Sequence, residues 1–287
     1  MSGGLRPYEE AVAICGGDFL MSPQRLRVCA GLVMAVVVAP AVWFLPRAAL
    51  LAAAALVAVL AAVEWGRLIG RGVSRRLYPL LCLAVIAWLW FAPPPAPERV
   101  LLYAAAGWWA LALVMVSAFS AGFCARLWFV WFLRVHIVVA AVAFWYAVGG
   151  LHLMHRGWLL YAIALTAACD IAAYYAGRRF GARKLCPDLS PGKTREGVLG
   201  ALAAAFVMAA AVSAALGMEW LDAVYFVLLS LFICLAGVVG DLAASMPKRC
   251  AGADDSGGLL PGHGGVLDRA DSLLAAAPLF LLGLSYL

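Results

Sequence analysis

Residues 197–217 read GVLGALAAAFVMAAAVSAALG, a run of apolar and small side chains without one charged residue. A helix needs about 20 predominantly apolar residues to cross the hydrocarbon core of a bilayer. Because lipid cannot hydrogen-bond to the backbone, a long apolar run without polar alternation is expected to form a helix, which satisfies its own backbone groups. This stretch therefore predicts a membrane-spanning helix.

The same pattern extends over most of the chain. Of its 287 residues, 66% are hydrophobic and only 13% are charged, so a soluble globule of this length could not hide its apolar surface. The sequence predicts an all-α polytopic integral membrane protein with about nine transmembrane helices. The expected spans are residues 28–45, 48–65, 77–92, 100–120, 127–148, 157–177, 197–217, 221–240 and 271–286.

Two places in this arrangement carry helix-breaking signals. Only Pro46 and Arg47 divide the first pair of spans. The span at 127–148 contains Arg134 and His136, which favour a break or a partly interfacial position.

The distribution of basic residues predicts the orientation, because cytoplasmic loops collect lysine and arginine. With a cytoplasmic N-terminus, 17 of the 21 basic residues lie inside, Arg134 lies within a span, and three lie outside. Those three are Arg47, Arg99 and Arg156. Residues 1–27 lack a continuous apolar core and are expected to be a cytoplasmic or interfacial segment rather than a signal peptide. Residues 28–156 would form N-terminal transmembrane helices, and residues 157–287 a C-terminal catalytic transmembrane region with cytoplasmic loops.

The excess positive charge is attributed first to this topology, with an anionic lipid or substrate attracted to the same face. No nucleic-acid partner is expected. The eight cysteines are scattered without a CxxC pair or a zinc-like Cys/His spacing, and are expected to be small apolar helix residues.

The last cytoplasmic connection concentrates charge and glycine in a protein that otherwise has little of either. Residues 240–272 read GDLAASMPKRCAGADDSGGLLPGHGGVLDRADS. Carboxylates are the ligands that magnesium prefers, while bases and glycine amides bind phosphates. The segment's acids are Asp241, Asp254, Asp255, Asp268 and Asp271, and its bases are Lys248, Arg249 and Arg269. His263 lies between two glycines and could contact a phosphate. This combination is expected where nucleotide phosphates bind through magnesium.

A second polar cluster lies at residues 185–197, LCPDLSPGKTREG. Its GKT is not a phosphate-binding P-loop, because Pro187 stands where that loop needs glycine. Ser190 is expected to cap the following helix, and Lys193 near a helix N-terminus would bind an anion. Asp170, inside a predicted span, is expected to face a polar cavity as a metal ligand or the partner of a base. No function is assigned to Glu64.

These motifs resemble those of the membrane-embedded phosphatidate cytidylyltransferase family, also called CDP-diacylglycerol synthase. The family signature runs Ser, Lys-Arg, Lys-Asp, His-Gly-Gly and Asp-Arg-x-Asp. The matching residues are Ser245, Lys248-Arg249, Asp254-Asp255, His263-Gly264-Gly265 and Asp268-Arg269-Ala270-Asp271. The resemblance also takes in Gly240-Asp241, Ser190 to Gly197 and Asp170 to Gly181, so it covers roughly the C-terminal half. Asp254 replaces the family's lysine, and Arg195 stands where an aromatic is common.

The resemblance implies attack by the phosphate of phosphatidic acid on the α-phosphorus of CTP, giving CDP-diacylglycerol and pyrophosphate at the cytoplasmic face of a bacterial inner membrane. It implies Mg²⁺ as the cofactor, with a second metal ion and a homodimer left open. The implied metal ligands are Asp170, Asp241, Asp255, Asp268 and Asp271. The implied phosphate-neutralising bases are Lys193, Lys248, Arg249 and Arg269, with His263 in contact with one phosphate. Ser190, Lys193, Ser245, Gly264 and Gly265 would bind the nucleotide.

Three other functions fit parts of this pattern. A cytidylyltransferase for another lipid phosphate, such as one with isoprenoid chains, would carry the same loop. Asp254 would suit a relative that has lost catalysis, and Arg195 would restore the missing charge only if it lay close by. A transporter or channel could also place Asp170 and Arg134 inside the membrane.

Overall fold

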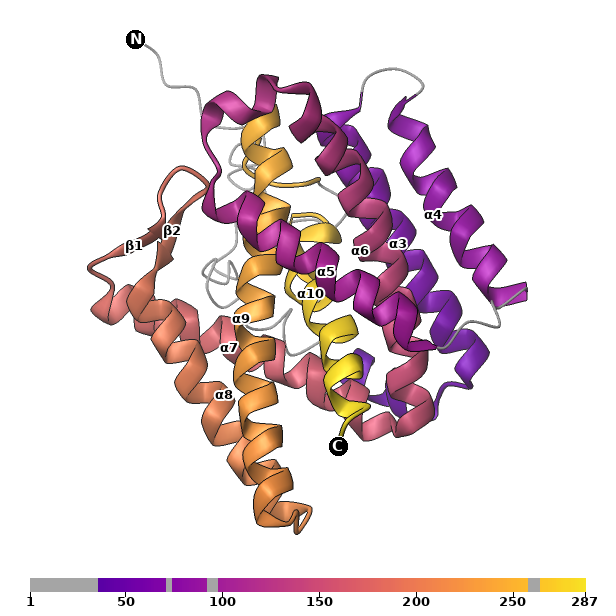
Figure 1. Cartoon of the computed structure of the whole chain (residues 1–287), viewed down its shortest axis with the longest axis vertical. Coiled ribbons are helices and arrows are strands. Elements are labelled where there is room, and N and C mark those ends of the chain that lie inside the picture. The colour runs from indigo at the N-terminus through magenta and orange to yellow at the C-terminus, as the bar shows by residue number, and fades with distance from the viewer. Residues whose placement is uncertain (1–35, 71–73, 92–97, 258–263) are drawn as a thin grey trace, which may run out of the picture. The chain divides into compact units, whose positions relative to one another are not determined.

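The computed structural model describes residues 36–70, 74–91, 98–257 and 264–287 (Figure 1). The chain divides into two compact units, Met1–Pro40 and Ala41–Leu287. Of the first unit, only residues 36–40 are described, and they are helical. His263 lies outside the described residues, as does most of the predicted span 28–45.

The second unit is built of helices. In chain order they are α3 (Arg47–Ile69), α4 (Ser74–Phe91), α5 (Glu98–Ser117), the 3-10 helix η1 (Ala121–Ala125), α6 (Leu127–Met154), α7 (Arg156–Phe180), α8 (Arg195–Ala215), α9 (Trp220–Ala251) and α10 (Leu267–Leu284). Within the described residues, six segments are long and apolar enough to cross a membrane: Arg47–Ile69, Arg99–Ser117, Leu127–Met154, Arg156–Phe180, Arg195–Ala215 and Trp220–Ala251. A polytopic helical membrane protein is therefore supported.

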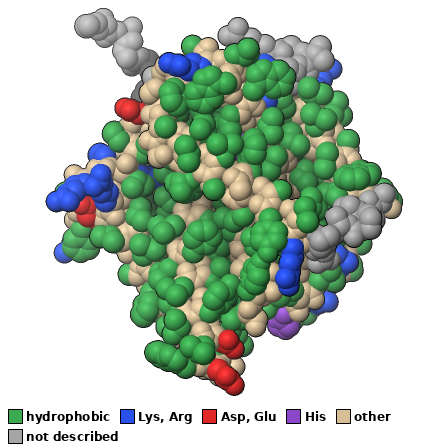
Figure 2. Space-filling view, viewed as in Figure 1, with side chains coloured by type: hydrophobic (Ala, Val, Ile, Leu, Met, Phe, Trp, Pro, Cys, Tyr) green, Lys and Arg blue, Asp and Glu red, His purple; other side chains and the backbone are tan. Residues whose placement is uncertain are grey.

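Large apolar side chains remain on the outside of these helices. Leu228 and Phe232 of α9 and Phe206 and Val207 of α8 are all more than half exposed. Figure 2 shows hydrophobic side chains over much of the visible face of the molecule. An exposed apolar surface of this extent is expected where the surrounding solvent is lipid.

Two expectations about helix breaks have different outcomes. Pro46 does separate a helical stretch at 36–44 from α3. The predicted break at 127–148 is wrong, because α6 runs unbroken from Leu127 to Met154. Its polar residues find aromatic partners: Trp108 Nε1 donates to His136 Nδ1 at 3.1 Å, and the Arg134 guanidinium lies 5.0 Å from the centre of the Trp131 ring. These aromatic contacts accommodate both side chains within an unbroken helix, although Arg134 Nε has no hydrogen-bond partner among the described residues.

The polar segment before α8 is not a plain loop but a short β-hairpin within the otherwise all-α structure. Strands β1 (Lys184–Cys186) and β2 (Ser190–Thr194) pair antiparallel, with Lys184 opposite Thr194. The predicted helix cap at Ser190 is wrong, because that residue belongs to β2. Thr194 caps α8 instead, since its hydroxyl accepts a hydrogen bond from the Gly197 amide at 3.1 Å.

Within the second unit, α10 packs against helices from both the earlier and the later parts of the chain. This helix packs against α9, α6, α5, α7 and α3, while α7, α8 and α9 pack against one another (Figure 1). Small residues allow the close approach: a Cβ on Gly240 of α9 would overlap the Asp271 carbonyl of α10, and one on Gly200 of α8 would overlap Ala176 of α7. Polar residues of α9 and α10 are thereby placed side by side.

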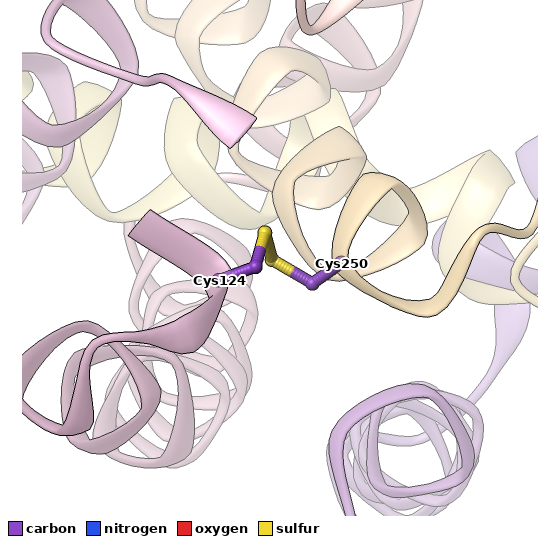
Figure 3. The surroundings of a disulfide bond; sticks show 2 residues. All are labelled: Cys124 and Cys250. Carbon is purple, nitrogen blue, oxygen red and sulfur yellow. A yellow bond between two sulfur atoms is a disulfide. The ribbon is translucent and has the colours of Figure 1, made fainter. Parts of the chain in front are cut away.

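The expectation that the cysteines are small apolar helix residues is wrong in three of the six that the structure describes, because two are paired and Cys186 lies in a strand. Cys124 of η1 and Cys250 at the end of α9 form a disulfide with a Cα–Cα distance of 5.2 Å (Figure 3). The other four described cysteines, Cys82, Cys169, Cys186 and Cys234, are free, and all but Cys186 are buried. The two partners are 126 residues apart, so the pairing depends on the fold and not on a local spacing pattern.

Candidate active site

A cavity of about 500 Å³ opens between α7, α8, α9 and the β1–β2 hairpin. We call it the α7–α9 cavity. Several residues expected at the site line it: Asp170, Ser190, Lys193, Asp241 and Ser272, with Lys184, Tyr174 and Arg178 among the other polar side chains. Side chains from positions 170 to 272 therefore share one space.

Lys193 and Asp241 form an ion pair across this cavity. The Lys193 Nζ lies 2.5 Å from Asp241 Oδ2, and both side chains are only partly exposed, at 24% and 30%. Lys193 comes from strand β2 and Asp241 from the middle of α9. The β1–β2 hairpin thus places the Lys193 ammonium group beside the Asp241 carboxylate of α9.

Two more carboxylates lie close to this pair. Asp170 of α7 and Asp271 of α10 each interact electrostatically with Asp241 and with Lys193. Asp170 also hydrogen-bonds the Ser272 side chain, and Asp271 accepts from the Ser272 amide at 2.7 Å. Three carboxyl groups therefore share one ammonium, and an incoming cation would favour their ionised forms.

A second group of polar side chains lies where α9 ends and α10 begins, and we call it the Asp268 cluster. Asp268 Oδ1 accepts from Lys248 Nζ at 2.9 Å. Its Oδ2 accepts from the Ser256 amide and hydroxyl, each at 3.0 Å, and from the Gly265 amide at 3.1 Å. Burial opposes ionisation of Asp268, but these donors outweigh it, and the pKa of the carboxyl lies below its usual value.

Glu64 of α3 completes the Asp268 cluster, and sequence reasoning missed it. This fully buried carboxylate accepts from Ser256 Oγ at 2.9 Å, Val266 N at 2.9 Å and Leu267 N at 2.8 Å. It therefore caps the N-terminus of α10. A Cβ on Gly265 would overlap Glu64, so the loop approaches the carboxylate only because glycine stands there. The sequence signal that could have identified Glu64 was its position within an apolar run. Burying an acidic side chain there costs free energy unless hydrogen-bond donors compensate it.

Helices α9 and α10 each contribute residues both to the group around Lys193 and to the Asp268 cluster. Asp241 and Lys248 lie seven residues apart on α9, and Asp268 and Asp271 lie three apart on α10. Both spacings place side chains on one helix face. The α7–α9 cavity and the Asp268 cluster are consequently neighbouring parts of one site.

Other expected site residues occupy the periphery. The Asp254 side chain is 97% exposed and lies 3.4 Å from Arg249 Nη1, while Arg249 Nε donates to the Leu189 carbonyl at 2.9 Å. Asp255 is also exposed. Arg195 is exposed at the start of α8, and Arg249 is the partner that Asp254 finds. The expected compensation of Asp254 by Arg195 is therefore replaced by a pair with Arg249.

The remaining expected residues support the backbone or lie at the surface. Ser245 is buried, and its hydroxyl donates to the Asp241 carbonyl one turn earlier on α9 at 3.0 Å. Gly264 has a φ of 77°, a left-handed conformation that suits glycine. Arg269 is exposed on the first turn of α10.

The donor chemistry of this site suits magnesium. In the part of the chain that the structure describes, no three carboxylate, imidazole or thiol groups converge as one ligand set. Mg²⁺, however, usually takes one or two carboxylates and completes its shell with water and substrate phosphates. Asp241 with Asp170 or Asp271 offers such a set, because the three carboxyl groups interact electrostatically with one another.

Comparison with known proteins identifies the family to which the chain is similar. Residues 25–287 match the sequence profile of the cytidylyltransferase family. The chain is 39% identical over 197 residues to a phosphatidate cytidylyltransferase of Haemophilus influenzae, covering 63% of this chain and 67% of that protein. It is 36% identical over 230 residues to one of Pseudomonas aeruginosa, covering 77% and 82%. It is 47% identical over 127 residues to one of Brucella suis, covering 43% and 45%.

The family match spans nearly the whole chain, including the N-terminal helices that the motifs alone did not cover. The matched range includes α3, whose Glu64 accepts a hydrogen bond from the Leu267 amide at the start of α10. On the strength of that match, this chain belongs to the cytidylyltransferase family.

Proposed function

We propose that the chain transfers the cytidylyl group of CTP to phosphatidic acid, giving CDP-diacylglycerol and pyrophosphate. The observation that carries the proposal is the pair of lysine–aspartate contacts, Lys193 with Asp241 and Lys248 with Asp268. When the nucleotide binds, each lysine would exchange its carboxylate partner for a phosphate group. Asp241, once released by Lys193, regains its affinity for a cation. A site for a magnesium–nucleotide complex needs this combination.

The chain's own residues would act chiefly by neutralising and orienting charge. The phosphate monoester of phosphatidic acid is already an anionic nucleophile near neutral pH, so the reaction demands no strong general base. Its barrier lies in bringing two anions together and in stabilising the leaving pyrophosphate. Lys193 would hold phosphate from the hairpin side and Lys248 from the α9 side, with Arg249 and Arg269 at the periphery.

Magnesium would be held by Asp241 together with Asp170 or Asp271. Bound there, it would supply positive charge to the phosphates of the nucleotide. Asp268 accepts four hydrogen bonds, so its main role would be to position Lys248 and the glycine loop until a phosphate draws the lysine away. Asp255 is exposed, and its Oδ1 lies near Gly264 on the same side as Asp268, so it would contribute from the solvent side of the site.

The site would face the cytoplasm of a bacterial inner membrane, where CTP is available. We propose nine crossings with a cytoplasmic N-terminus, because this orientation leaves only three basic residues outside. The acyl chains of the lipid would stay in the bilayer while its phosphate reaches the α7–α9 cavity between helices.

An assay of purified protein tests the proposal directly. Protein in detergent would be incubated with CTP, Mg²⁺ and phosphatidic acid, and both lipid-linked CMP and pyrophosphate would be measured. Equal amounts of the two products are expected, and Asp241→Asn should abolish both. An isoprenoid phosphate offered in parallel identifies a different lipid substrate if it alone reacts. Failure of every lipid phosphate to react would overturn the proposal.

A further inference from the structure

A second cavity of about 770 Å³ lies at the end of the second unit away from the active site. Its walls come from the first turns of α3 and α5 and from the last turns of α4, α6 and α10. The active-site residues occupy the other ends of two of these helices: Glu64 stands near the end of α3, and Asp268 at the start of α10. Since α3 is long enough to cross a membrane and α10 packs against it, we infer that the two cavities open toward opposite faces of the membrane.

This remote cavity has an apolar wall and a cationic rim. Its apolar lining includes Leu51, Leu102, Trp90, Trp145, Leu153 and Leu281. Arg47 and Arg99 line it as well, and both are exposed. Neither arginine forms an ion pair with a carboxylate among the residues that the structure describes. The Arg99 guanidinium lies 5.4 Å from the centre of the Tyr286 ring, a contact that leaves its edge donors free.

A third arginine adds to the positive charge at this end. Arg156 begins α7, and its guanidinium donates to the Trp43 carbonyl. The charges of Arg47 and Arg156 both act on His152 near the end of α6, so the three side chains lie close together. Arg47, Arg99 and Arg156 are also the three basic residues that the charge distribution leaves on the outer face. Arginines kept together beside an apolar wall would repel one another unless an anion neutralised them.

We propose that the remote cavity binds one anionic phospholipid of the leaflet opposite the active site. Arg47 and Arg99 would hold its phosphate, since guanidinium groups match phosphate oxygens in geometry and charge. An acyl chain would lie along the leucine and tryptophan wall. The apolar wall favours a lipid over a soluble anion, and the exposed side chains of Leu153 and Met154, at 58% and 48%, leave the rim open toward the bilayer. This lipid is not the substrate, because it lies at the other end of α3 and α10 from the catalytic lysines.

Native mass spectrometry of the full chain tests this site. Protein would be delipidated in detergent and titrated with phosphatidylglycerol or with phosphatidylcholine of the same acyl chains. Wild-type protein is expected to retain one phosphatidylglycerol in preference to phosphatidylcholine. Removing both arginines, Arg47→Ala with Arg99→Ala, should lower that retention roughly tenfold or more, because each basic residue near a membrane surface adds to the attraction for an anionic lipid.

Three control variants test whether the remote cavity itself holds the lipid. Replacing the exposed pair Arg75 and Arg76 by alanine removes the same charge from α4 and should leave retention unchanged. Lys193→Met should also leave it unchanged; if Lys193→Met lowers retention instead, the lipid occupies the active site and the proposal is wrong. Ala48→Trp fills the remote cavity from an exposed position while keeping both arginines, and should reduce retention even if the double arginine variant does not fold.

Several results would overturn the proposal. Equal retention of the two lipids would mean that the remote cavity does not select for a negative charge. Equal losses in the α3/α5 and α4 arginine pairs would mean that only the net charge of the protein matters. Unchanged retention in Ala48→Trp would place the lipid elsewhere. A dimer that excludes lipid, and that Ala48→Trp dissociates, would show that a second copy of the chain covers this cavity.

Discussion

The two parts of the site differ in how completely their charges are satisfied. In the Asp268 cluster, both carboxylate oxygens of Asp268 and both of Glu64 accept hydrogen bonds from fixed donors. At the α7–α9 cavity, Asp170 and Asp241 line open space, and together with the buried Asp271 they share one lysine. A saturated cluster holds a loop and a helix in place, whereas an undersatisfied one binds ligand. We therefore expect changes in the Asp268 cluster to affect stability, and changes in the cavity to affect catalysis.

The largest effect on activity is expected at Lys193. Lys193→Met removes the cation that faces the cavity from β2 and should lower kcat/KM about 10²–10³-fold, the usual effect of losing one charged group that stabilises a transition state. The melting temperature should change little. Lys184→Met is the matched control, because Lys184 lines the same cavity from β1 without an ion pair to a carboxylate in the described residues. Equal losses in both variants would refute a specific role for Lys193.

The largest effect on stability is expected at Glu64. Glu64→Gln turns one acceptor oxygen into a donor facing buried backbone amides, and should destabilise the protein by about 2–4 kcal/mol. Thermal unfolding in detergent measures the change, and activity should fall only as the folded fraction falls. Glu196→Gln is the control: Glu196 Oε2 accepts from the Ala182 and Arg183 amides, but at the surface. A smaller shift in melting temperature is expected there.

The lowered pKa of Asp268 predicts a loss of stability in acid. In the unfolded chain this carboxyl titrates at its usual pKa, and in the folded protein at a lower one. Its contribution is therefore complete above the usual pKa and is lost as the pH falls through the folded pKa. Melting temperatures from about pH 7 down to about pH 3 should fall less steeply for Asp268→Asn than for the wild type. Parallel curves would show that Asp268 is not part of the acid transition.

The smallest effect is expected at Asp254, although this residue departs most from the family signature. Asp254→Lys restores the signature lysine at a side chain that is 97% exposed, and should change activity by no more than about twofold. Initial rates of CTP turnover measure it. A large gain of activity would instead favour the alternative that the chain has lost catalysis through this substitution.

Local physics was enough to predict the helices, whereas the roles of the candidate site residues came mainly from the resemblance to a family signature. Apolar runs locate helices because lipid leaves the backbone no alternative, and the signature motifs named Lys193, Asp241 and Asp268. The sequence did not reveal which polar and charged side chains contact one another in the fold. Lys193 contacts Asp241 only because the hairpin folds over α9, and Glu64 meets Ser256 across 192 residues. Ser190 was misplaced because a proline–glycine segment suits a strand turn as well as a helix start.

The disulfide has a practical consequence for mapping how the chain crosses the membrane. Cys124 and Cys250 close a covalent loop that contains α6, α7, the hairpin, α8 and most of α9. A protease cut in any connection inside that loop would yield two peptides that migrate together on a gel without reductant and separate when reductant is added. A cut outside the loop would separate the fragments in either condition. Digestion of sealed vesicles from one side at a time would therefore assign each connection to a membrane face, with the chain's own cross-link as the internal marker.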